Sequence, residues 1–335
     1  MSRRSNYYVL LTMVAGILVT ACAMIVAVFI ASQRPSIVII QAAGSQGTPP
    51  APAITSLEGA RGADAGRPAG PPQLLVARVA AAPATTDPFD KAWDKVTPLE
   101  VALQPQMQAM PMLETPTVRA VVAQAVRDSG RIVWRLSWPA PKPSHNVDAA
   151  RFCDAVAMQF APGLDTSYMM GGPGKPVRIL HWKAVWQKDV DSGFQDVQDL
   201  HPNYWADMYW FSEGKFPFPV TEAFKNPVAR QWLVASQAGN PMADYQRRQP
   251  VEEIIAEGLG TATHVPATIS SARGAWKDGR WTVVIDRPLA ADDPLSRLTQ
   301  AAQAPVVSLA VWDGSANNVG GRKHFCTWLA MKVEP

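Results

Sequence analysis

The sequence predicts a mainly β fold, a β-sandwich domain with a few short helices, preceded by one transmembrane helix. Three observations lead to this prediction. Beyond residue 73 the chain holds short runs rich in β-branched and aromatic residues, and Gly, Pro and Asp turns separate these runs. No regular alternation of strands and helices follows, and a single long uncharged segment lies near the start.

The N-terminal segment is expected to anchor the chain in the cytoplasmic membrane. Residues 7–31 carry no charge and can span a hydrocarbon core of about 30 Å. Arg3 and Arg4 precede this segment, so the positive-inside rule places residues 1–6 in the cytoplasm and the C-terminal domain in the periplasm. A cleaved signal peptide and lipidation at Cys22, in "VTAC", are the alternatives.

Residues 32–73 are expected to form a tether. The segment is rich in Ala, Gly and Pro and poor in bulky apolar residues, so burial cannot offset the entropy of ordering it. A flexible chain of this length spans on the order of 30 Å. The folded domain is then expected over residues 74–335.

Alternating patterns within this domain indicate strands. In "GRIVWRLSWPAP", Ile132, Trp134 and Leu136 occupy every second position, as in a strand with one buried face. Further strands are expected in "DAVAMQFAP", "PVRILHWKAVW", "GRWTVVIDRPL" and "APVVSLAVWDG". "PTVRAVVAQAVRD" fits a helix or a strand, and residues 226–237 favour a helix. The irregular stretch 191–265 is expected to be an insertion of small helices and loops.

Composition and motifs exclude several classes of function. The formal net charge of +3 comes without a basic stripe, so nucleic-acid binding is not expected. The sequence has no GxSxG, HExxH, P-loop or dinucleotide fingerprint. It has no CxxC pair, which argues against a covalently attached haem and a structural zinc site. Cys153 and Cys326 could form a disulfide or stay as two buried thiols.

Two Gly-rich loops carry side chains that could bind a ligand. The stretch "SYMMGGPGKP" places Met169 and Met170 directly before a Gly-Pro turn, and "NNVGGRKHFCTW" places Lys323 and His324 before the last strand. Residue chemistry alone favours packing for the methionines and a solvated surface charge for the lysine.

Six segments, taken in order, resemble a known family. They are "DPFDKAW", "RFCDAVAMQF", "MGGPGKPVRILHWKA", "AEGLGTAT", "GAWKDGRWTVVIDRPL" and "AVWDGSANNVGGRKHFCTW". Together they resemble the haem-binding subunits typified by the gamma subunit of ethylbenzene dehydrogenase, over roughly residues 77–333. Relatives of that subunit serve dimethyl sulfide, chlorate and selenate enzymes, and related subunits occur with nitrite oxidoreductases.

The resemblance implies a β-sandwich that holds one non-covalent haem b, with Met170 and Lys323 as the axial iron ligands. Met169, His324 and His181 are the alternative ligands. Such a subunit has no catalytic site of its own. It passes electrons between the Fe-S subunit of a periplasmic molybdenum oxidoreductase, with its molybdenum catalytic subunit, and a carrier such as a c-type cytochrome. The two ligand loops are expected at one end of the sandwich, between the sheet edges.

A binding module without a redox role is the alternative function. In that interpretation the domain is a tethered β-sandwich that binds a carbohydrate or a protein. Exposed tryptophans would supply the contact surface for a carbohydrate, and the candidates are Trp182, Trp186, Trp205 and Trp210. Fold class alone does not separate the two functions.

Overall fold

The computed structural model describes residues 72–84, 86–204, 215, 220–266, 268–289, 293–298 and 305–335. The expected transmembrane helix (7–31) lies outside the described residues, as does the expected tether except for its last two positions. None of the helices in the described ranges combines the length and the apolar character needed to cross a membrane.

Short strands make up most of the regular secondary structure in the described residues. The strands are β1 (Gln73–Arg78), β2 (Leu99–Ala102), β3 (Gln104–Pro105), β4 (Ala120–Arg127), β5 (Arg131–Pro139), β6 (Ala155–Ala161), β7 (Val177–Lys183), β8 (Val251–Ala256), β9 (Thr263–His264), β10 (Ser271–Lys277), β11 (Arg280–Pro288), β12 (Val306–Trp312), β13 (His324–Phe325) and β14 (Leu329–Val333). The helices are η1 (Lys91–Lys95), α2 (Ala184–Ser192), α3 (Val197–Leu200), α4 (Val220–Ala223), α5 (Pro227–Arg230), α6 (Val234–Gln237), η2 (Pro241–Ala243), α7 (Pro294–Leu298) and η3 (Gly314–Ala316). The prediction of a mainly β domain with few short helices is confirmed.

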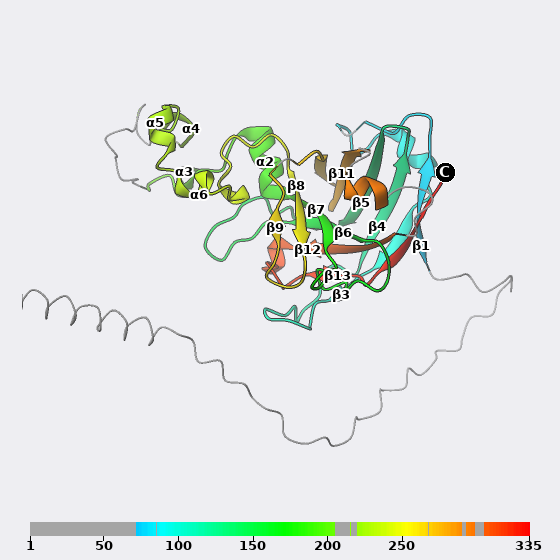
Figure 1. Ribbon diagram of the computed structural model, residues 1–335. Coiled ribbons are helices and arrows are strands. Elements are labelled where there is room, and N and C mark those ends of the chain that lie inside the picture. The colour runs from blue at the N-terminus through cyan, green and yellow to red at the C-terminus, as the bar shows by residue number, and fades with distance from the viewer. Residues whose placement is uncertain are drawn as a thin grey trace, which may run out of the picture. The chain divides into compact units, whose positions relative to one another are not determined.

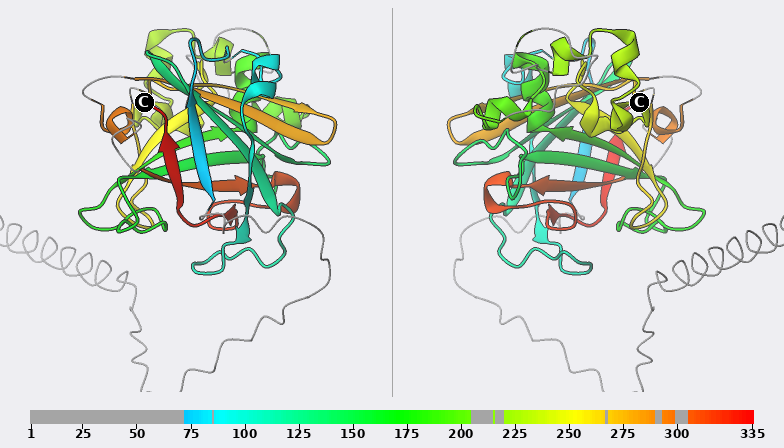
Figure 2. Two further views of the ribbon diagram at one scale, coloured as in Figure 1. Left: turned by 90° about the vertical axis from the view of Figure 1, so that its right-hand side faces the viewer. Right: turned by 90° about the vertical axis from the view of Figure 1, so that its left-hand side faces the viewer.

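All the strands belong to one hydrogen-bonded sheet that folds back on itself (Figure 1). Its main path runs β10-β11-β5-β4-β1-β14-β12-β6-β7-β8-β9. Figure 2 shows β1 and β14 running steeply and β6, β7 and β12 running across the view, so the sheet turns near β14. The result is a β-sandwich in which β10, β11, β5 and β4 form the first layer and β12, β6, β7 and β8 form the second.

Aromatic side chains fill the space between the layers. The ring centroids of Trp134 (β5) and Phe160 (β6) lie 5.3 Å apart, and those of Trp281 (β11) and Trp182 (β7) lie 5.0 Å apart. The alternation predicted for β5 is confirmed, since its even-numbered residues from 132 to 138 are buried in the main core. Burial of such large rings contributes most of the packing energy of a core.

The structure settles several points that the sequence left open. "PTVRAVVAQAVRD" contains strand β4 rather than a helix, and residues 226–237 form two one-turn helices, α5 and α6. Strand β8 lies inside the expected insertion and pairs with β7. Cys153 and Cys326 are both free thiols.

The tryptophans proposed to bind carbohydrate also differ from expectation. Trp182 and Trp186 are 0% and 1% exposed, because Trp182 points into the main core and Trp186 is covered on helix α2. Neither can therefore serve as a sugar platform. Trp205 and Trp210 lie outside the described residues.

Candidate functional site

The outer face of the second layer carries small side chains at its centre. Successive strand residues point to opposite faces, so Met158 and Phe160 enter the main core whereas Ala157 faces outward. Ser308 and Ala310 of the neighbouring strand β12 lie beside Ala157 on that outer face. These short side chains leave a hollow above the sheet.

A cavity of about 290 Å³ occupies this hollow. Loops from four parts of the chain complete its walls, and they contribute Met110, Met169, Met170, Leu259, Gly320 and Lys323. Among the described residues that line it, Lys323 is the only charged one. This cavity lies on the outer face of one layer, whereas the sequence suggested a site between the sheet edges.

The methionine loop is held by a tight turn. Gly171 donates its N–H to the carbonyl of Ser167 at 2.9 Å, and Met170 adopts a φ of +67°. A left-handed backbone is uncommon for a residue other than glycine and has to be held by its surroundings. Here the Met170 carbonyl accepts the N–H of Gly258 at 2.8 Å, and the Met170 side chain packs on the outer-face residues. The turn brings both Met169 and Met170 to the cavity wall.

The lysine loop presents an amine that has no hydrogen-bond or ion-pair partner among the described residues. In the described structure, Lys323 Nζ makes no hydrogen bond or ion pair, and its closest recorded partner is the Trp312 ring at 5.3 Å from the centroid. Burial lowers the pKa of Lys323. Lys323 is half-buried, and a lysine amine in its neutral form offers a lone pair that can bind a metal.

His324 is placed differently from its neighbour. The side chain is fully buried, and its Nε2 accepts the backbone N–H groups of Thr117 at 2.9 Å and Val118 at 3.1 Å. Its Nδ1 lies 3.3 Å from the carbonyl oxygen of Val311. Both ring nitrogens are therefore engaged, and His324 does not line the cavity.

His181 lies on the same outer face but lines an adjoining cavity, also of about 290 Å³. Its Nδ1 is 3.4 Å from Glu252 Oε1, and its buried Nε2 has no hydrogen-bond partner in the described structure. Burial, followed by the charge of Lys183, lowers the pKa of His181 to about 4. The ring centroid of Trp312 lies 5.1 Å from the imidazole, so Trp312 contacts both His181 and Lys323.

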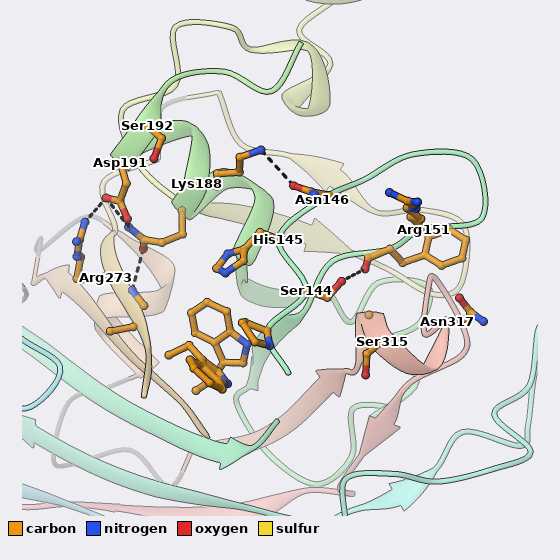
Figure 3. Close-up of a pocket in the computed structure, with 18 of the residues that line it drawn as sticks. Ser144, His145, Asn146, Arg151, Lys188, Asp191, Ser192, Arg273, Ser315 and Asn317 are labelled. Atoms are coloured by element: carbon orange, nitrogen blue, oxygen red, sulfur yellow. Dashed lines mark hydrogen bonds and ion pairs between the residues drawn. The ribbon is translucent and has the colours of Figure 1, made fainter. Parts of the chain in front are cut away.

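A larger cavity, of about 860 Å³, contains none of these candidate ligands (Figure 3). It lies beside helix α2 and strand β10, and its polar groups largely satisfy one another. Arg273 pairs with Asp191, and Lys188 donates to Asn146 at 3.1 Å. Size alone therefore does not identify the functional cavity.

Comparisons with known proteins give one consistent family. The family described as ethylbenzene dehydrogenase matches residues 90–324. A Haloferax mediterranei protein named respiratory nitrate reductase heme subunit ORF7 is 25% identical over 78% of this chain and 74% of its own length. The chlorate reductase subunit gamma of Ideonella dechloratans is 24% identical over 70% of this chain and 74% of its own length.

Solved structures give only a loose likeness. A family 9 carbohydrate-binding module from Caldicellulosiruptor kristjanssonii, in complex with glucose, shares 9% identity over 78% of this chain and 96% of its own, with a TM-score of 0.36. That likeness carries no functional argument, whereas the family match spans most of the folded domain. We conclude that the chain belongs to the ethylbenzene dehydrogenase gamma-subunit family.

Proposed function

We propose that this protein is the haem-binding, electron-transfer subunit of a multisubunit oxidoreductase, with Met170 and Lys323 holding the iron of one haem b. The observation that carries the proposal is the shared cavity. Two loops far apart in sequence bring a thioether and an unpaired amine to the same apolar hollow. The names of the relatives, a nitrate reductase heme subunit and a chlorate reductase gamma subunit, support it.

The residues that line the cavity fit a haem. Small outward side chains and apolar loop residues suit a flat apolar ring, and the two donors suit its iron. With Met170 and Lys323 as its ligands, a bound haem would supply one-electron redox chemistry and would leave no open position for a substrate. Met170 would contribute a soft neutral ligand, which raises the reduction potential.

Lys323 must be neutral to donate its lone pair. Removing the proton from an exposed lysine at pH 7 costs about 4–5 kcal/mol. Burial lowers the pKa of Lys323, and none of the described carboxylates pairs with its ammonium form, so the cost is smaller here. Because a proton and iron compete for the same lone pair, ligation by Lys323 should weaken as the pH falls.

The assembly around this subunit is inferred from its relatives and from the sequence. The expected partners are an Fe-S subunit, a molybdenum catalytic subunit and a carrier such as a c-type cytochrome. Segment 7–31 would anchor the chain in the cytoplasmic membrane, and the tether would hold the domain in the periplasm.

Absorption spectra of ligand variants test the proposed haem site. The purified chain should contain haem that acid acetone extracts, with a low-spin spectrum. Met170→Ala and Lys323→Ala should each open a coordination position and give a high-spin spectrum, and Met170→Ala should also lower the potential. Met169→Ala and Lys332→Ala are the matched controls, because Met169 is the adjacent methionine and Lys332 is exposed on β14.

Three results would contradict the proposal. The first is a chain that binds no haem when haem is supplied. The second is a low-spin spectrum that survives both Met170→Ala and Lys323→Ala. The third is a high-spin spectrum in Met169→Ala but not in Met170→Ala, which would assign the ligand to the other methionine.

A further inference from the structure

A buried glutamine next to the lysine loop forms hydrogen bonds with both the nitrogen and the oxygen of its side-chain amide. Gln106 is 2% exposed. Its Nε2 donates to the carbonyls of Gly321 at 2.9 Å and Ala109 at 2.7 Å. Its Oε1 accepts the N–H groups of Gln108 at 2.6 Å and Ala109 at 2.7 Å. Two donors and two acceptor positions are all that a glutamine amide offers.

The backbone of Gln106 is tied to the ligand residue itself. Its N–H donates to the carbonyl of Lys323 at 2.9 Å. This bond extends the short antiparallel pairing of β3 with β13, two strands that lie side by side in Figure 1. Gln106 therefore contacts the lysine loop through its main chain at Lys323 and through its side chain at Gly321.

The two loops approach more closely than side chains allow. A Cβ atom added to Gly321 would lie 2.8 Å from the carbonyl oxygen of Pro111 and 3.2 Å from Gln106 Nε2. Real Cβ atoms are not found so close to a backbone oxygen, so this contact requires glycine. The segment 106–111, called the strap below, is thus packed directly on the loop that carries Lys323.

The strap also reaches the methionine loop. Gln108 Nε2 donates to the hydroxyl of Tyr168 at 3.1 Å, and Tyr168 immediately precedes Met169. Ala109 and Met110 line the cavity from the strap side, and Met110 is 79% exposed. The strap therefore forms an outer wall that connects the two ligand loops.

We infer that Gln106 is a positioning residue for the proposed haem: it fixes the Lys323 loop and fastens the strap that retains the haem. The inference rests on the proposed function. Loss of the amide would leave the carbonyls of Gly321 and Ala109 and two strap N–H groups without partners, so both loops would loosen together. Haem would then leave faster, and Lys323 would spend less time on the iron.

The rate of haem transfer to excess apomyoglobin tests this in the full chain. Gln106→Ala and Gln106→Glu should lose haem roughly tenfold faster than the parent, or more. Leaving the buried partners of Gln106 without hydrogen bonds favours the loosened strap over the closed one by about this factor. Gln106→Glu keeps the size and the acceptors but removes both donors. The low-spin fraction should fall in both variants, and further at lower pH. Gln104→Ala is the matched control, since Gln104 is an exposed glutamine two residues away.

Hydrogen exchange in the haem-free chain provides a readout that does not depend on haem. Exchange should accelerate at residues 107–110 and 320–323 in the Gln106 variants and stay unchanged in Gln104→Ala. Haem loss within twofold of the parent, or unchanged exchange, would overturn the inference even if Met170 and Lys323 prove to be the ligands. A chain that binds no haem would contradict the proposed function, and the exchange data would still decide whether Gln106 fastens the strap. If Gln106→Ala does not fold, the haem-loss rate and the hydrogen exchange of Gln106→Glu test the inference in its place.

Discussion

Replacement of His181 by asparagine should flatten the pH dependence of stability between pH 7 and pH 5. In the folded chain, burial and the nearby charge of Lys183 lower the pKa of His181 to about 4, against an ordinary value of 6.5. As the pH falls below 6.5, the unfolded chain binds a proton at this position and the folded chain does not. The contribution of His181 to stability is therefore fully present above pH 6.5 and is lost as the pH falls towards 4.

The size of the effect follows from the two pKa values. A difference of 2.5 units, from 6.5 to 4, corresponds to about 3 kcal/mol over the whole range. Between pH 7 and pH 5 the loss is about 2 kcal/mol, because protonation of the folded state has barely begun at pH 5. The neighbouring carboxyl titrates lower, since hydrogen bonding and charge from His181 and Lys183 outweigh burial and lower the pKa of Glu252 to about 2.

Denaturant unfolding of the parent and of His181→Asn at several pH values measures this difference. The free energy of unfolding of the parent should fall by about 2 kcal/mol more than that of the variant from pH 7 to pH 5. His264→Asn is the comparison variant, because it removes the other histidine contact to the same carboxylate, at 3.0 Å, and leaves His181 in place. Parallel curves for the parent and His181→Asn would refute the assignment of a neutral, buried imidazole.

Two further predictions concern the rest of the chain. Gly314→Ala should lower the free energy of unfolding by roughly 1–3 kcal/mol, because its Cβ would lie 2.1 Å from the carbonyl oxygen of Phe152. Gly172→Ala is the control, since nothing lies within 4 Å of its added Cβ, and equal losses in the two variants would contradict the steric argument. The full chain should fractionate with membranes, and protease outside the cytoplasmic membrane should release a soluble domain by cutting within residues 41–73. A domain that is soluble in untreated cells, with a new N-terminus near residue 31, would show instead that the segment is a cleaved signal.

The strand pattern was largely predictable because it depends on local alternation. Ile132, Trp134 and Leu136 recur every second residue, and the structure buries all three. "PTVRAVVAQAVRD" was ambiguous because its apolar residues are nearly continuous, and only the pairing of β4 with β5 decides between helix and strand. The parallel pairing of β1 with β4 and β14 leaves no local signal at all.

The candidate site was predictable in part. The resemblance pointed to Met170 and Lys323, and the structure brings both to one cavity, but their residue types alone favoured packing and a surface charge. Trp182 was wrongly interpreted as exposed, although it shares its strand parity with Leu180, and both are buried in the main core. Gln106 gave no signal because its bonds to the lysine loop, at Gly321 and Lys323, join segments that meet only in the folded chain.

The placement of β1 between β4 and β14 affects when the domain can fold during synthesis. Gln73 pairs with Ala330, so β1 cannot complete its pairing until β14 has been synthesised. Contacts of such large sequence separation are slow to form, and until β14 pairs with it, β1 leaves one sheet edge open to other chains. Folding of the whole sheet must therefore follow release of β14 from the ribosome, and a chaperone that covers β1 until then would limit aggregation.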